Sequence, residues 1–292
     1  MTDTEYGVLV AVGPDGAHDG ALDLAACEAV RRRTGVLLLH VVHSIRSAPS
    51  AVQQVDSLDR TLTRVGTDVL RDAAERLRTR LDGRAPMTTE LATGPVAGTI
   101  AVRAADCELL IMERRDTGWA ERLLTMSVTT RVATHTATPV IVVPEGWRHK
   151  YDEAALPVTV GVDRPLDAQD QVETALVYAR DAGRRLVVLH AAWLAEQYQD
   201  LGFSNSTRDH WRHEAQRELE LALSKVPDLY TVDVTVDVPW RRPADALVGA
   251  TKTSYLLVLN RRDEHPLGAH LGPMTRAVLR HAEGPVMIVG RT

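Results

Sequence analysis

Two charged triplets stand at the ends of apolar runs about half the chain apart. The run ELLIME is followed by Arg114–Asp116, and the run YLLVLN is followed by Arg261–Asp263. Guanidinium groups bind carboxylates and phosphates through paired hydrogen bonds, so each triplet has two alternative uses. The arginines either pair with the aspartates across the turn or with the opposite domain and close a vestigial pocket, or they bind a small anion such as a short phosphate, a cyclic nucleotide or a carboxylate metabolite.

Histidines supply the other candidate chemistry. His210 and His213, followed by Glu214, have a helical spacing that suits a metal ion, but no third ligand is evident and a solvated helix face is favoured. His40 and His190 each end an apolar run, and we interpret them as core or rim histidines and not as general bases. The sequence contains no G-x-S-x-G, Walker A, H-E-x-x-H or G-x-G-x-x-G segment. We therefore expect no metal site and no enzyme, with only weak nucleotide hydrolysis left open.

The sequence segments that must form the elements positioning these residues occur twice in the chain. The segment Tyr6–Gly13 matches Leu156–Asp163, with 163 − 13 = 150. His40 and His190 keep the same offset, since 190 − 40 = 150, and later blocks match at offsets of 147 and 146 (260 − 113 and 285 − 139). Collinear matches of this kind indicate a duplicated domain. We assign domain 1 to residues 1–146, a polar linker to 147–156 and domain 2 to 157–292.

Short apolar runs alternate with amphipathic helical segments in each copy. In the first copy we expect strands at 8–12, 36–42, 88–93, 107–112 and 139–143, and helices at 21–33, 57–83, 97–105 and 124–136. We expect Gly35 to end the first helix. The segment Thr231–Val238 alternates Val with Asp or Thr, which is typical of a sheet edge with one wet face. The pattern predicts an α/β fold with an open five-stranded parallel sheet in each domain, the third strand at an edge, and helices on both faces.

Composition limits the partners. With 45% hydrophobic and 25% charged residues the chain is globular, and its net charge of −5 disfavours nucleic acid. Aromatic residues are 4% of the chain, which argues against a stacking platform for single-stranded bases. Two isolated cysteines, no basic leader and no long apolar stretch predict a cytoplasmic protein that does not enter a membrane.

Ligands of open α/β sheets bind outside the carboxyl ends of the strands, where the strand order reverses. If the first and fourth strands are the central neighbours, that crevice is lined by Gly13 in the first copy and by its counterpart Asp163 in the second. Both charged triplets then lie at the crevice as well. Asp163 has an alternative role as the cap of the following helix.

The chain resembles the universal stress protein family in its tandem, actinobacterial form. The resemblance is carried by VTVGVD, by the LH that ends the second strand, by GPVAGTIAVRAADCELLIM, by MSVTTRVATHTATPVIVVPEGW and by GPMTRAVLRHAEGPVMIVG. It implies the strand order 3-2-1-4-5 of the adenine nucleotide alpha hydrolase-like fold. Many members of the family bind ATP through an Asp that ends strand one and a loop patterned G-x2-G-x9-G-[ST] after strand four.

In this chain the loop after strand four departs from that glycine pattern. In the first copy Glu113 and Asp116 take the places of the first two glycines, Met126 that of the third, and Ser127 keeps the hydroxyl. In the second copy the places of the first two glycines fall to Asn260 and Asp263, Gly272 keeps the third, and Pro273 replaces the hydroxyl residue. The strand-one aspartate survives as Asp163, whereas the first copy has Gly13 there unless Asp15 enters from its loop.

The candidate pocket residues follow from this correspondence. Those of domain 1 are Gly13, Asp15, Val41, Glu113, Arg114, Arg115, Asp116, Ser127, Val128 and Thr129. Those of domain 2 are Asp163, Ala191, Asn260, Arg261, Arg262, Asp263 and Gly272. A carboxylate about 5 Å from a phosphate charge costs roughly 3 kcal/mol at an effective dielectric near 20, which is about a hundredfold in affinity.

The resemblance therefore implies a stress-response binding module with a degenerate nucleotide pocket that acts through unidentified protein partners or a small anionic ligand. The alternative is an ATP or AMP sensor that uses mainly domain 2. The family's fifth strands often meet edge to edge, which here would pair Val140–Val143 with Val286–Val289 inside one chain, and a homodimer is left open.

Overall fold

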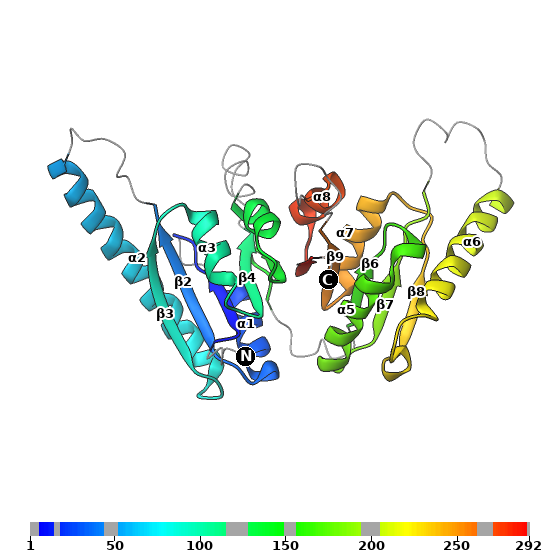
Figure 1. Cartoon of the computed structure of the whole chain (residues 1–292), viewed down its shortest axis with the longest axis horizontal. Coiled ribbons are helices and arrows are strands. Elements are labelled where there is room, and N and C mark those ends of the chain that lie inside the picture. Colours follow the sequence, from blue (N-terminus) through cyan, green and yellow to red (C-terminus); the bar gives the residue numbers. More distant parts are fainter. Residues whose placement is uncertain are drawn as a thin grey trace. The chain divides into compact units, whose positions relative to one another are not determined.

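The computed structural model describes residues 6–14, 18–43, 52–114, 128–148, 156–193, 205–261 and 271–290, without the side chains of 52–58. The chain divides into two compact units, Met1–His149 and Lys150–Thr292 (Figure 1). Each unit contributes five parallel strands with the helices that connect them.

Domain 1 contains a five-stranded parallel sheet. Its strands are β1 (Val8–Ala11), β2 (Val36–Val42), β3 (Met87–Thr93), β4 (Leu109–Arg114) and β5 (Val140–Pro144). They lie in the order β3-β2-β1-β4-β5, and all described pairings are parallel. The predicted order 3-2-1-4-5 is confirmed, so the carboxyl ends of β1 and β4 are neighbours.

Domain 2 repeats this sheet. Its strands are β6 (Val158–Gly161), β7 (Leu186–Leu189), β8 (Val234–Asp237), β9 (Leu256–Asn260) and β10 (Val286–Val289), in the order β8-β7-β6-β9-β10. The predicted edge strand is confirmed as β8, where Val234 and Val236 are half-buried while Thr235 and Asp237 are exposed. The central strands are apolar and almost fully buried, because helices cover both faces of a parallel sheet.

Helices connect the strands in both domains (Figure 1). Domain 1 has α1 (Asp19–Arg32), α2 (Val52–Leu81), α3 (Val96–Ala104) and a helical segment at 128–135. Domain 2 has η2 (Pro165–Asp167), α5 (Gln169–Asp181), α6 (Asn205–Leu223), η4 (Leu229–Thr231), α7 (Pro243–Thr253) and α8 (Pro273–His281). Helix α1 packs against α2, and α7 packs against α8.

Among the element ends that differ from the sequence prediction, two are explained by local contacts. Helix α1 is ended by Arg33 in the left-handed conformation at φ 56°, and not by Gly35. Its N–H donates to Val30 O, and the next N–H donates to Ala29 O, so the last carbonyls are satisfied before Gly35 is reached. Strand β4 continues to Arg114, which pairs with Pro144, so Glu113 and Arg114 belong to the strand and not to the turn.

Candidate functional site at the carboxyl ends of the strands

The strand order brings the described site residues of each domain to one edge of its sheet. Gly13 follows β1 and Glu113 is near the end of β4, and these two strands are paired along their length. Some predicted site residues lie outside the described residues: Asp15, Arg115, Asp116, Ser127, Arg262 and Asp263. The structure therefore describes only the first arginine of each charged triplet, and the two interpretations of the triplets stay predictions.

A buried histidine occupies the space beside Gly13. His18 is 2% exposed, and the Gly13 N–H donates to its Nε2 at 2.9 Å. Burial lowers the pKa of His18, with the repulsion by His40 and Arg76 acting in the same direction, so the ring is neutral near pH 7. In this domain the backbone N–H that follows strand one is thus used by the protein itself.

The Glu113 carboxyl group is directed at the first turn of α1. The Ala21 N–H donates to Glu113 Oε2 at 3.3 Å, across 92 positions of sequence. Free N–H groups at a helix N-terminus favour an anion, and here a carboxylate of the chain holds that position. Burial raises the pKa of Glu113 to about 7, and the neighbouring Glu145 and Asp19 add to that rise.

The segment after β5 packs on the same helix end. A Cβ at Gly20 would lie 2.4 Å from the Trp147 carbonyl oxygen, so only glycine permits this approach. Arg148 Nη2 donates to Asp19 Oδ2 at 3.0 Å. The described part of the crevice in domain 1 is therefore lined by protein groups that satisfy one another.

His40, which lies inside β2, and His190, which directly follows β7, hold neighbouring strands together. His40 Nδ1 lies 2.7 Å from Val12 O, and His190 Nδ1 lies 3.0 Å from Val162 O, again at an offset of 150 (190 − 40). A carbonyl oxygen only accepts, so Nδ1 carries the proton in both rings. This arrangement agrees with core or rim histidines. Val41, the next residue in domain 1, is buried.

Domain 2 presents a different edge. Asp163 is exposed, and the capping alternative for it is wrong: Arg164 is the N-cap of η2, Ala168 is the N-cap of α5, and neither helix has a side-chain cap bond. Ala191 is half-buried near the end of the second strand. Asp163 is thus not the N-cap residue of η2 or of α5.

The counterpart of Glu113 in domain 2 is neutral. Asn260 ends β9, and its Oδ1 is buried without a hydrogen-bond partner among the described residues. Arg261 follows, and its N–H donates to Val289 O at 2.8 Å. Gly272 is the N-cap of α8 at φ −60°, and Pro273 takes the first helical position, where its missing N–H is tolerated. This edge contains an amide where domain 1 has a carboxyl group.

The remaining predicted site residues give weaker support for a functional site. Val128 and Thr129 begin the described part of the helix after the β4 loop, half-buried and buried respectively. His210 and His213 are exposed on α6, with Glu214 4.0 Å from His210. Among the residues that the structure describes, no group of three metal-ligating side chains gathers.

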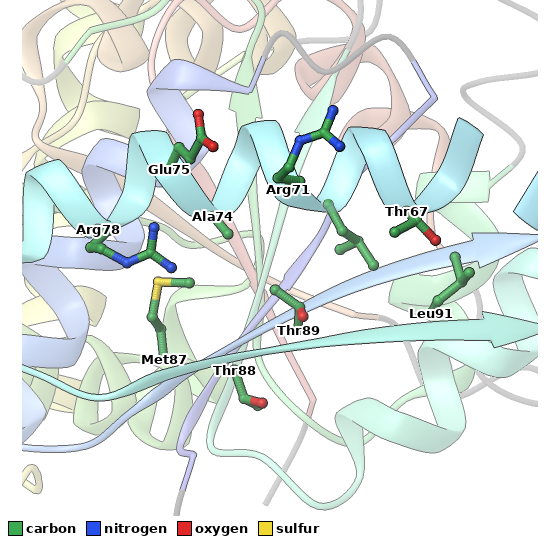
Figure 2. A pocket seen from close by; sticks show the side chains of 10 residues that line it. Thr67, Arg71, Ala74, Glu75, Arg78, Met87, Thr88, Thr89 and Leu91 are labelled. Atoms are coloured by element: carbon green, nitrogen blue, oxygen red, sulfur yellow. The ribbon is translucent and has the colours of Figure 1, made fainter. Parts of the chain in front are cut away.

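Two features were missed by the sequence analysis. Three tryptophans meet beside β7 and β8, with ring centroids 6.4 Å apart for Trp193 and Trp240 and 6.2 Å apart for Trp211 and Trp240. A cleft of about 700 Å³ lies between α2 and β3 (Figure 2). Both depend on how a helix crosses an edge strand, for which the sequence carries no local signal. Within the described ranges, no helix is long and apolar enough to cross a membrane.

Comparisons with known proteins agree with this architecture. The sequence model of the Universal stress protein family matches residues 7–144 and again 156–290. A universal stress protein of Mycobacterium tuberculosis is 28% identical over 305 residues, covering 98% of this chain and 95% of the relative. One of Mycolicibacterium smegmatis is 26% identical, covering 98% and 97%. The crystal structure of a universal stress protein from Archaeoglobus fulgidus matches with a TM-score of 0.64 at 15% identity, covering 99% of this chain and 100% of that one, which shows the fold.

Proposed function

This chain belongs to the universal stress protein family, and on that premise we propose that it is a stress-response regulatory binding module whose first domain does not hold ATP in the usual family manner. The proposal concerns the two crevices at the carboxyl ends of the strands. Solved universal stress proteins include one in complex with cAMP and one in complex with dAMP.

The Glu113 carboxyl group carries the proposal. It stands where the family pattern has the first phosphate-loop glycine, and it accepts the Ala21 N–H at the start of α1. A polyphosphate brought to this edge meets either an ionised carboxylate or a buried acid whose proton release it opposes. At about 5 Å the ionised form costs roughly 3 kcal/mol, a loss of about a hundredfold in affinity.

The His18 ring supports the same conclusion. Family members with an aspartate after strand one have an anionic acceptor there, whereas this domain has Gly13, whose N–H is bound to buried His18. Among the described residues after strand one, none offers a carboxylate to a ligand hydroxyl there. Among the described residues, domain 1 has neither the strand-one aspartate nor the first loop glycine of the family's ATP-binding pattern, and we assign it a role in contacts with protein partners.

Domain 2 is a second candidate for nucleotide binding. It has an exposed Asp163, a neutral Asn260 with a buried acceptor, and Gly272 at the start of α8. Because no carboxyl group replaces the first glycine of its loop, it lacks the repulsion described for Glu113. The second candidate function is therefore an ATP or AMP sensor with one site in each chain.

The proposal contains no catalytic step, since the chain has none of the hydrolase motifs sought in its sequence. The test is to purify the full chain, denature it, and measure nucleotide in the supernatant by chromatography. ATP and AMP titrations by calorimetry follow on the wild type and on Asp163→Ala and Glu113→Gln.

We expect no stoichiometric nucleotide and no ATP turnover. One nucleotide per chain that is lost in Asp163→Ala would establish the domain 2 sensor instead. Two nucleotides per chain would contradict the proposal that domain 1 does not hold ATP. Turnover of ATP that disappears in Asp163→Ala would make the protein an enzyme. We also expect Glu113→Gln to raise the affinity of domain 1 for ATP at pH 8.

A further inference from the structure

The third strands of the two domains, β3 and β8, differ in how their outer edges are protected. Strand β8 has four residues, and exposed Asp233 and Asp237 stand at its two ends. Strand β3 has seven residues and contains no Lys, Arg or Pro; its one charge, Glu90, is paired with Arg103 at 2.7 Å. Short length and charge are the usual protections against pairing with another chain. Strand β3 is longer, and its one charge is already paired, although it ends the strand order of domain 1.

The phase of the ladder identifies the free main-chain groups of β3. Val36 N–H donates to Pro86 O, and Gly94 N–H donates to Val42 O, so the even-numbered residues between them bond to β2. The N–H and C=O groups of the odd-numbered residues are then turned to the outer edge: Met87, Thr89, Leu91 and Thr93. An added strand would find a regular row of donors and acceptors there.

The side chains of the same odd-numbered residues line the cleft below α2. Figure 2 shows Met87, Thr89 and Leu91 directed toward α2, while Thr88 points to the opposite face. The wall of the cleft that α2 forms includes Leu70 and Ala74, which are 4% and 6% exposed. Met87 and Leu91 are half-buried and four residues apart, which is about 13 Å along a strand. The cleft therefore offers two apolar contact points beside a free strand edge.

We propose that an extended segment of a partner protein adds to the β3 edge and places alternate apolar side chains into this cleft. Main-chain hydrogen bonds to β3 would supply affinity, and the cleft would supply specificity. The segment has apolar residues four positions apart, which contact Leu91 at one end and Met87 at the other.

Charge adds one requirement to the partner. Arg71 is already paired with Asp68 at 2.8 Å, and Glu75 is directed away from β3 (Figure 2). The Arg78 guanidinium lies above Met87 and makes no hydrogen bond or ion pair with the residues that the structure describes. The partner segment accordingly carries an acidic residue next to the apolar side chain at Met87. This inference rests on the proposed role as a binding module, but its test does not involve nucleotide.

The test uses the full chain and a phage-displayed library of random 12-residue peptides. We expect selected peptides to share apolar residues four positions apart with a flanking acid. A synthetic copy of the consensus should slow hydrogen exchange at the Met87, Thr89 and Leu91 amides. Thr89→Pro removes one outward N–H without touching the β2 ladder, and edge strands tolerate proline. This change and Arg78→Glu should each weaken binding at least tenfold.

Matched controls lie on the other edge strand and farther along the same helix. The Val236 N–H also points outward on β8, so Val236→Pro should leave peptide affinity unchanged, as should Arg64→Glu on α2. Peptides that bind Thr89→Pro normally, or that protect amides away from β3, would overturn the proposal. A concentration-dependent dimer of the wild type that Thr89→Pro abolishes would also overturn it, because the occupant would be a second copy of this chain. If Thr89→Pro fails to fold, hydrogen exchange on the wild-type chain still tests the proposal, because it shows whether the peptide protects the β3 amides.

Discussion

Single residues distinguish two domains that share one fold. Glu113 and Asn260 occupy equivalent ends of the fourth strands, yet the first is an acid held by the Ala21 N–H and the second a neutral amide with a buried acceptor. Arg33 and Gly183 both end the first helix of their domain with positive φ, at 56° and 63°. The duplication therefore supplies an internal control for each of these positions.

Glu113 should make the stability of the protein depend on pH. Its pKa is raised to about 7 in the folded state, above the ordinary value of 4.5, so between these values the folded protein retains a proton that the unfolded chain has lost. Stability from this site therefore falls as pH rises from about 4.5 to about 7. Asp19 and Glu145 oppose ionisation, while Arg148 favours it.

We expect Glu113→Gln to remove this loss while keeping an acceptor for the Ala21 N–H. The melting temperature of the variant minus that of the wild type should increase between pH 5 and pH 7 and level off above it. Glu75→Gln, at an exposed position on α2, serves as the control with a flat difference. A flat difference for Glu113→Gln as well would mean that its carboxyl group is solvated.

Arg33→Gly should stabilise domain 1. A left-handed conformation costs an L-residue about 1 kcal/mol more than glycine, and the turn itself is already built by backbone hydrogen bonds. Gly183→Ala, at the equivalent turn of domain 2, should destabilise by a similar amount. Urea denaturation measures both, and a neutral result at Arg33 would show that its side chain contributes a compensating contact.

At the scale of elements, the long helix α2 determines the free surfaces of domain 1. Arg80 near its end pairs with Asp23 and, at 2.9 Å, with Asp19, so it is tied to the start of α1. Gly66 allows it to approach the sheet, since a Cβ there would lie 2.8 Å from Leu91 and 2.9 Å from His40. The cleft beside β3 is a consequence of this crossing.

Two glycine-to-alanine changes test this contact. Alanine at a helix interior is favoured over glycine by about 1 kcal/mol, but Gly66→Ala must displace Leu91 or His40 and should destabilise domain 1 by about 1–3 kcal/mol. Gly98 lies in α3 with no atom within 4 Å of an added Cβ, so Gly98→Ala should stabilise by about 0.5–1 kcal/mol. Denaturant titration of both variants gives the comparison, and equal signs would contradict the close approach of α2.

For the whole molecule, the chain is a tandem of two complete α/β units. Each has five parallel strands with fully buried residues: Leu9, Leu38 and Ile111 in one and Leu186, Leu256 and Leu257 in the other, all at 0% exposure. A unit with its own core is able to fold alone.

Residues 1–149 and 150–292, expressed separately, should therefore each unfold cooperatively. Far-UV circular dichroism during urea titration measures this, with the full chain as reference. A half that shows no cooperative transition would mean that its core requires the other half.

The sequence by itself determined the duplication, the element types and the strand order through the family resemblance. The duplication and the element types follow from local periodicity and from a repeat offset that drifts by only a few residues, and both are visible without tertiary contacts. The strand order was implied by the resemblance alone. It also predicted that Glu113 would stand at the crevice, although the strand in which it lies continues to Arg114.

Only the tertiary structure decided which groups meet there. The contact of Glu113 with Ala21 spans 92 positions, and the bond from Gly13 to His18 depends on the burial of a loop residue that no periodicity identifies. The same holds for the capping alternative at Asp163, for the helix end at Arg33 and for the cleft under α2. Hydrophobic periodicity fixes which face of an element is buried, whereas polar contacts depend on distances between elements, and these are set when the elements pack.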